Sequence, residues 1–455
     1  MMMRNECDAL VRLAVPLIVA ALAQMAMGLT DSILLGRLGS AALAAGGLAV
    51  NLFFTLVVIA QSVLSSASVL VAQARGAGRP EDSSAIYGTG LLLGALFSVP
   101  LMVLFAFAEP LMRLAGEPAA LAHDVGRYLR ILLWATPAFI GGTGLLRSLL
   151  PAVEGGTLLL RVTPPLAVLN GLVNYGLIFG RFGLPRMGFE GSATATLLTL
   201  WLGALLLFVL AQRGRRTRPF LSPLRIDRRL IAPLLRLGVP IGLTAAAEML
   251  LFLVAGLAAG LLGTASLAAH QVVLSIATTT FMVPMSLGQA ANVRTGMATG
   301  ARDPSWQRRA GFAAIGIAAA TMTGIGILLL LLPRTAVGIY LDLSAPDNAA
   351  TVSVALKLLA IAACFQLVDG IQATAMGALR GLGDTTRPML IATGGYWLVG
   401  APLGVLLAFA AGMGARGLWL GLAAGLAVVA LLTTLRFRRL TMPARTARIL
   451  QPVQG

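Results

Sequence analysis

Long apolar runs recur along this chain and constrain its fold more than any other feature of the sequence. Each run has about twenty or more residues with few charges, which is enough for a helix to cross a hydrocarbon core of about 30 Å. The composition agrees, because 58% of the 455 residues are hydrophobic and only 11% are charged. In soluble domains about 25% of the residues are charged. We therefore expect a polytopic membrane protein.

The spans are predicted to be helical. Membrane barrels use strands of about ten residues with alternating polarity, and no such alternation is seen in this sequence. Charged residues, glycines and prolines divide the apolar stretches into twelve spans, at approximately 10–35, 43–72, 85–108, 124–146, 160–180, 190–212, 232–260, 267–296, 309–333, 350–377, 388–411 and 415–435. The expected fold is an all-α bundle of twelve transmembrane helices.

Arginine is unevenly distributed among the predicted loops and indicates the orientation. All of the 34 basic residues except Lys357 are arginines, and they concentrate in alternate loops, above all between Arg213 and Arg229. Cytoplasmic loops retain such residues, so the net charge of +17 requires no nucleic-acid partner. Both termini are then expected in the cytoplasm, which agrees with an even number of spans.

The two halves of the chain repeat each other at a fixed offset. The segment from Arg12 to Pro16 falls on Arg236 to Pro240 without a gap. Six spans per half make the two lobes parallel, related by a pseudo-two-fold axis along the membrane normal. The expected organisation is an N-terminal lobe over 1–212, a basic cytoplasmic linker over 213–231, a C-terminal lobe over 232–437 and a cytoplasmic tail over 438–455.

Of the 17 acidic residues, 14 lie in loops, near span ends or at the termini, and the exceptions are Asp31, Glu248 and Asp369. A charged carboxylate at membrane depth costs about 2.5 kcal/mol or more, so such residues usually face a cavity and mark an ion or substrate path. The alternative is a structural acid that is hydrogen-bonded to a neighbouring helix. In the repeat, Gln24 corresponds to Glu248 and Ala255 corresponds to Asp31, so the lobes differ chemically. We predict two distinct sites, each able to be neutralised by a proton or by Na⁺.

Other polar side chains are candidates for ligands and cavity walls. Asn170 and Asn174 share one helix face, and together with Thr196 they can offer oxygen ligands beside Asp31. Interhelical hydrogen bonding is the alternative for each of them. The further candidates for lining a cavity are Gln24, His270, Gln271 and Gln366. For His270, a satisfied buried histidine is a commoner arrangement than a proton relay.

Prolines in the first span of each half predict hinges, at Pro16 and Pro240. The two cysteines, Cys7 and Cys364, lie far apart in sequence and indicate neither a disulfide framework nor a metal cluster. No motif for ATP binding or metal-dependent catalysis is found. We therefore expect a protein that is not an enzyme and needs no cofactor beyond a coupling ion, Na⁺ or H⁺.

Five segments resemble the multidrug and toxic compound extrusion (MATE) family. They run from Leu13 to Gly36, Asn170 to Tyr175, Ala265 to Gln271, Phe365 to Asp369 and Leu379 to Asp384. The pair of Glu248 and Asp369 is similar to the NorM branch. The resemblance implies a V-shaped transporter of two six-helix lobes that exports organic cations and amphipathic drugs in exchange for Na⁺ or H⁺.

The resemblance also implies which residues couple the ion. Glu248 and Asp369 correspond to a C-lobe site for a cation or proton, with Phe365 where NorM proteins usually have a tyrosine. The implied N-lobe site consists of Asp31, Asn170, Asn174 and Thr196. A lipid-linked oligosaccharide or lipid flippase of the same superfamily is the alternative, but its cavity should be cationic, whereas these spans carry mainly acids. We expect a monomer in the bacterial inner membrane, with drugs and the lipid bilayer as partners.

Overall fold

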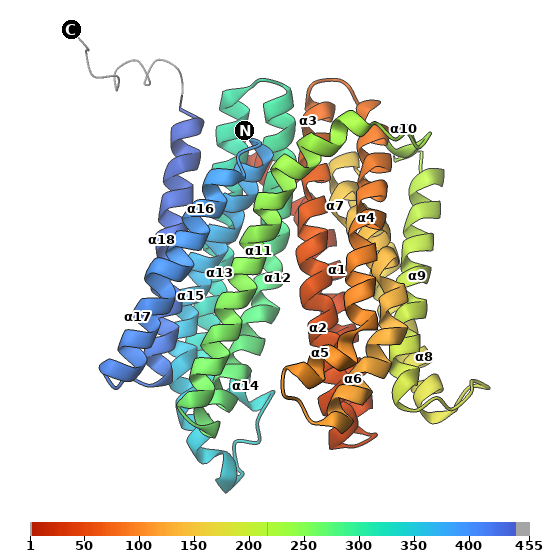
Figure 1. Cartoon of the computed structure of the whole chain (residues 1–455). Helices are drawn as coiled ribbons and strands as arrows, with labels where there is room; N and C mark the ends of the chain where they lie inside the picture. The colour runs from red at the N-terminus through yellow and green to blue at the C-terminus, as the bar shows by residue number, and fades with distance from the viewer. Residues whose placement is uncertain (1, 216, 443–455) are drawn as a thin grey trace. The chain divides into compact units, whose positions relative to one another are not determined.

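The computed structural model describes residues 2–215 and 217–442, and all regular elements in these ranges are helical (Figure 1). The helices of the first half are α1 (Met2–Gly36), α2 (Ser40–Leu64), α3 (Ser66–Gly76), α4 (Asp82–Ala106), α5 (Ala108–Leu114), α6 (Ala119–Leu132), α7 (Leu145–Leu149), α8 (Gly156–Phe179), α9 (Phe189–Arg213) and α10 (Arg218–Leu221). Those of the second half are α11 (Ile231–Leu261), α12 (Thr264–Gly300), α13 (Pro304–Leu331), α14 (Pro333–Gly338), α15 (Ala349–Gly381), α16 (Thr386–Gly394), α17 (Ala401–Val405) and α18 (Ala415–Leu440). Short 3₁₀ turns are η1 (Leu133–Ala135), η3 (Leu150–Val153), η4 (Arg228–Leu230) and η5 (Pro346–Asn348), and π turns are η2 (Ala138–Gly144), η6 (Gly395–Gly400) and η7 (Leu406–Ala410).

Eleven helical segments of the described chain are long and apolar enough to cross a membrane. A twelfth span is obtained if the pair Ala119–Ala135 and Ala138–Val153, which is bent by 42°, counts as one. The bend falls at Pro137, where the missing backbone N–H breaks the helical hydrogen-bond ladder. The prediction of an all-α polytopic membrane protein is confirmed. Most of the predicted tail, residues 443–455, lies outside the described residues, as does Arg216.

Several helices extend beyond the ends of the predicted spans. Arg147 and Arg380 lie just outside the predicted spans 124–146 and 350–377, but Arg147 lies within α7 and Arg380 in the last turn of α15. The predicted spans end too early here because a charged side chain does not stop a helix. Long basic side chains near helix ends can extend their charged group along the helix while the backbone hydrogen bonds continue. Both arginines therefore belong to the helical bundles.

The chain divides into two compact units. The C-unit consists of the residues up to Val15, Gly76–Gly78 and the residues from Leu243 onward, and the N-unit consists of Pro16–Arg75 and Arg79–Gly242. Helices α1 and α11 therefore each pass from one unit to the other, and both do so close to a proline, Pro16 or Pro240. These two prolines are equivalent in the sequence repeat.

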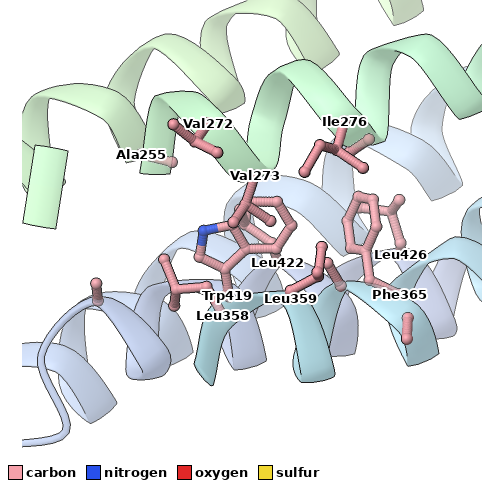
Figure 2. Packing of buried hydrophobic residues seen from close by; sticks show 14 of the residues in the cluster. Ala255, Val272, Val273, Ile276, Leu358, Leu359, Phe365, Trp419, Leu422 and Leu426 are labelled. Atoms are coloured by element: carbon pink, nitrogen blue, oxygen red, sulfur yellow. The ribbon is translucent and has the colours of Figure 1, made fainter. Parts of the chain in front are cut away.

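In the C-unit, α15 packs against α12, α13 and α18. Figure 2 shows the aromatic and aliphatic side chains at this centre, where Trp419 is fully buried and its ring meets that of Phe365. The helix backbones approach closely as well, because a Cβ atom on Gly377 of α15 would lie 2.1 Å from the carbonyl oxygen of Gly288 on α12. Small residues that permit such contacts are typical of membrane bundles.

In the N-unit, α8 packs against α9, and the π turn η2 packs against both α9 and α4. The contact of α8 with α9 places the asparagines of one helix beside the threonines of the next. This arrangement positions the first of two polar clusters.

Candidate functional site

The carboxylate of Asp31 is held by two other helices of the N-unit. Asp31 lies in the last part of α1 and is only 6% exposed. Asn174 of α8 donates a hydrogen bond from Nδ2 to its Oδ1, and Thr196 of α9 donates from Oγ1 to its Oδ2 at 3.3 Å. The structure therefore brings these three residues together from α1, α8 and α9.

Asn170 belongs to the same cluster but does not bond Asp31. Its Nδ2 donates to Oγ1 of Thr199 at 3.3 Å. The Oδ1 atoms of Asn170 and Asn174 are fully buried and have no hydrogen-bond partner within the described chain. Because buried polar atoms are normally paired, two such amide oxygens beside a carboxylate form a donor set suited to a small hard cation.

Tyr128 on α6 adds a hydroxyl to this cluster. It is fully buried, its Oη lies 3.1 Å from Oγ of Ser192, and it interacts electrostatically with Asp31. Sequence reasoning missed Tyr128 and Ser192. A signal was present for Ser192, which precedes Thr196 by four residues and so lies on the same helix face.

The second cluster lies in the C-unit. Asp369 on α15 is 5% exposed, and its Oδ1 has no hydrogen-bond partner among the described residues. It interacts electrostatically with the half-buried Glu248 on α11. Arg380, at the end of α15, interacts in turn with Glu248. The two predicted acids thus come together, and Arg380, which was not predicted for the site, partly compensates the charge of Glu248.

Phe365 and Gln366 precede Asp369 on α15 but make other contacts. The Phe365 ring is 1% exposed and meets Trp419 edge to face, with a centroid separation of 5.6 Å and an interplanar angle of 67° (Figure 2). It meets Phe252 similarly, at 6.5 Å and 76°. Gln366 donates from Nε2 to Oγ1 of Thr280. Phe365 is therefore part of the aromatic core.

His270 is also part of this core. Its Nδ1 accepts a hydrogen bond from Nε1 of Trp419 at 3.2 Å, and the side chain is 1% exposed. An Nδ1 atom that accepts carries no proton, so the neutral ring has its proton on Nε2. The neighbouring Gln271 is exposed. The Nε2 atom of His270 is buried and has no hydrogen-bond partner among the described residues. The His270 ring is therefore only partly satisfied, by its contact with Trp419 in the aromatic core.

Gln24 lies beside a basic residue. Arg147 donates from Nη1 to Oε1 of Gln24. In the repeat Gln24 corresponds to Glu248, whose basic neighbour is Arg380. An arginine therefore lies near the equivalent position in both units. In the N-unit Arg147 contacts the amide of Gln24, and in the C-unit Arg380 interacts with the carboxylate of Glu248.

Tyr396 and Gln372 are further site residues that sequence reasoning missed. Gln372 of α15 donates from Nε2 to Oη of Tyr396 at 2.6 Å, and both side chains are buried. Tyr396 interacts electrostatically with Glu248, Asp369 and Arg380. For Gln372 the signal was its spacing, three residues after Asp369. No comparable signal pointed to Tyr396, which lies in a different span.

Comparison with known proteins gives matches over nearly the whole chain. A family model described as MatE matches residues 16–175 and 240–406. A protein of Burkholderia mallei called "Probable multidrug resistance protein NorM" is 51% identical over 428 residues, which cover 94% of this chain and 92% of that protein. "Multidrug resistance protein NorM" of Burkholderia vietnamiensis is 50% identical with the same coverage. A NorM protein of Mesorhizobium japonicum is 40% identical over 96% of this chain and 94% of its own length.

Solved structures with low sequence identity share the fold. The eukaryotic MATE transporter AtDTX14 matches with a TM-score of 0.86 at 22% identity, over 98% of this chain and 99% of that chain. A MOP superfamily transporter from Pyrococcus furiosus matches with a TM-score of 0.86 at 19% identity, over 96% of both chains.

Proposed function

This chain belongs to the MATE family, and we propose that it is a multidrug efflux transporter of the bacterial inner membrane. The observation that carries the proposal is about 50% identity, over more than nine tenths of both chains, to proteins named for multidrug resistance. The chain moves its substrates and does not transform them, so no catalytic group is assigned. Drugs and the lipid bilayer are its partners, and the transporter acts as a monomer.

The two acid clusters are the proposed sites of ion coupling. Asp31, with Asn170, Asn174 and Thr196, forms the N-lobe site, and Glu248 with Asp369 forms the C-lobe site. A buried carboxylate whose neighbours are oxygen atoms can be neutralised by Na⁺ or by H⁺, and no other cofactor is required. An ion shifts a conformational equilibrium only if it binds the two states with different affinity. Each cluster must therefore hold its ion more tightly in one transport state than in the other.

The cargo is proposed to be cationic and amphipathic. Five amide or carboxylate oxygens in or next to the two clusters are buried and have no hydrogen-bond partner among the described residues, those of Asn170, Asn174, Gln366, Asp369 and Gln372. Oxygen acceptors of this kind attract cations and repel the pyrophosphate of a lipid-linked oligosaccharide. The half-buried Arg147 and Arg380 add positive charge beside predicted site residues and weaken this contrast. Arg147, however, donates a hydrogen bond to Gln24, and Arg380 interacts electrostatically with Glu248, so part of that charge is compensated. A drug exporter remains favoured over a flippase.

Proteoliposomes containing a trapped fluorescent organic cation test the proposal. Efflux is measured with an imposed Na⁺ gradient alone and with an imposed pH gradient alone. We expect one of the two gradients to drive efflux in the wild type, and the amide variants Asp369→Asn and Glu248→Gln to abolish it because the exchangeable charge is lost. Asp347→Asn, which removes an exposed acid in the 3₁₀ turn η5, serves as the matched control.

The variant Asp31→Asn separates the two sites. It should abolish transport but leave ion binding at the C-lobe acids, measured by calorimetry on the purified protein. Normal export by the Asp369 and Glu248 variants at wild-type expression would contradict the coupling role. Loss of all ion binding in Asp369→Asn alone would contradict the second site.

A further inference from the structure

Tyr396 is placed beside the C-lobe acids by an irregular turn. It is the second residue of the π turn η6 and has no exposed surface. The next residue, Trp397, donates from Nε1 to the carbonyl oxygen of Ala247 at 3.3 Å, and Ala247 directly precedes Glu248 on α11. Single π turns inside α-helices change the direction of side chains and are frequent at functional sites. Here the turn is attached to the helix that carries Glu248.

The hydroxyl of Tyr396 is also tied to the helix that carries Asp369. Gln372 Nε2 donates to Tyr396 Oη at 2.6 Å. Gln372 follows Asp369 by three residues, so the two side chains lie on one face of α15. Tyr396 and its neighbour therefore connect the two segments that contribute the acids. The Tyr396 hydroxyl bonds Gln372 on α15, and the Trp397 indole bonds Ala247 on α11.

The direction of this hydrogen bond determines what the hydroxyl can do next. Because Gln372 uses a lone pair of the Tyr396 oxygen, the hydroxyl proton remains available for an acceptor. The buried acceptors without a partner on this stretch of α15 are Asp369 Oδ1, Gln372 Oε1 and Gln366 Oε1. Gln372 already faces the hydroxyl with its amide nitrogen, and Gln366 is oriented by its bond to Thr280. Among these acceptors of α15, Asp369 Oδ1 therefore remains.

The charged groups around Tyr396 support the same pairing. Glu248 and Asp369 contribute negative charge and Arg380 contributes positive charge, each acting on Tyr396. Arg380 is paired electrostatically with Glu248. Glu248 thus has a compensating positive charge, whereas among the described residues the charged neighbour of Asp369 is Glu248 itself. A hydroxyl donor is therefore needed more at Asp369 than at Glu248.

We propose that Tyr396 is a positioning residue of the C-lobe ion site, whose hydroxyl, held by Gln372, donates a hydrogen bond to the Asp369 carboxylate when the coupling ion has left. The inference rests on the proposed ion-coupling function. The hydrogen bond stabilises the ion-free state and so assists release of the ion. Phe365 cannot supply this hydroxyl, and its ring is packed between Trp419 and Phe252.

The variant Tyr396→Phe removes only the hydroxyl. We expect the half-saturating concentration of the coupling ion to fall about tenfold, the scale of losing one hydrogen bond to a charged group, and the maximal efflux rate to fall because the ion leaves more slowly. Loss of packing alone would lower the rate without tightening ion binding. Gln372→Met, which keeps the side-chain length, should tighten binding in the same direction by a smaller factor. Tyr87→Phe, at a fully buried tyrosine of α4, is the matched control and should change neither quantity.

The experiment uses the full chain in proteoliposomes, with Na⁺ and pH varied separately. A wild type that responds to neither ion contradicts the proposed coupling itself. A wild type that responds normally, together with unchanged or weaker ion binding in Tyr396→Phe, overturns the role of Tyr396 and leaves the coupling intact. If Tyr396→Phe fails to insert, Gln372→Met decides by the same criterion. Restoration of wild-type ion affinity by Phe365→Tyr in the Tyr396→Phe background also overturns the proposal, because a hydroxyl at position 365 points into the aromatic core.

Discussion

Gly377 on α15 illustrates how single residues determine the approach of helices in the C-unit. A Cβ atom at this position would lie 2.1 Å from the carbonyl oxygen of Gly288, a backbone atom that cannot rotate away. We expect Gly377→Ala to push α15 from α12 and to lower the stability by about 1–3 kcal/mol. The measurement is the thermal unfolding midpoint of the purified protein in detergent. Transport should fall as well, because α15 carries Asp369.

The matched control for this substitution is Gly316→Ala on α13, where an added Cβ atom meets no other atom within 4 Å. Alanine favours a helix over glycine by up to about 1 kcal/mol, so this variant should be neutral or slightly more stable. Equal unfolding midpoints for the two alanine variants would show that the contact between Gly377 and Gly288 does not limit the packing.

At the scale of elements, α1 and α11 are the first helices of the two halves. Each begins in one unit, is held there by contacts near its start, and then continues into the other unit. Glu6 in the first turns of α1 accepts hydrogen bonds from Arg294 at 2.6 and 2.7 Å and from Trp306 Nε1 at 3.1 Å, all within the C-unit. The start of α11 is packed in the N-unit, where a Cβ atom on Gly238 would lie 2.1 Å from the Val63 carbonyl oxygen. Both anchors precede the proline at which the helix passes to the other unit.

We predict that these prolines are hinges. Alanine at Pro16 or Pro240 restores a backbone N–H and stiffens the helix, so each variant should lower the efflux rate severalfold while leaving expression and thermal stability unchanged or slightly raised. The assay is initial efflux of the fluorescent cation. Pro304→Ala is the control, because Pro304 is in the first turn of α13, where no intrahelical N–H bond is required. Wild-type rates in both hinge variants would refute the prediction.

At the scale of the whole molecule, the arginine distribution predicts that the linker over 213–231 and both termini are cytoplasmic. We expect a cysteine at Leu224, a linker residue that is 45% exposed, to react with a membrane-impermeant maleimide only after the cells are permeabilised. A cysteine at Leu114, which is 84% exposed at the end of α5, should react in intact cells. The native Cys7 and Cys364 are first replaced, since Cys364 is exposed. The reverse labelling pattern would invert the predicted topology.

Much of the architecture could be predicted from the sequence because the relevant signals are local. An apolar segment of sufficient length indicates a membrane span wherever it occurs in the chain. The repeat of Arg12–Pro16 at Arg236–Pro240 is found by aligning the sequence with itself. The acids Asp31, Glu248 and Asp369 also stand out by themselves, because a carboxylate in an apolar span is costly. These acids can be identified without knowing which residues contact them in the fold.

The sequence by itself therefore determined that the chain is a bundle of membrane helices with two repeated halves and a few acids at membrane depth. Only the tertiary structure decided which partners those acids have. Asn174 and Asp31 are 143 positions apart, and Tyr396 and Gln372 lie in different spans. The directions in which Phe365, Arg147 and Arg380 point were likewise not readable, because each depends on the helix packed against it. Hydropathy is a property of a segment, whereas a hydrogen bond or a ring contact is a property of a pair, and the fold alone brings the pair together.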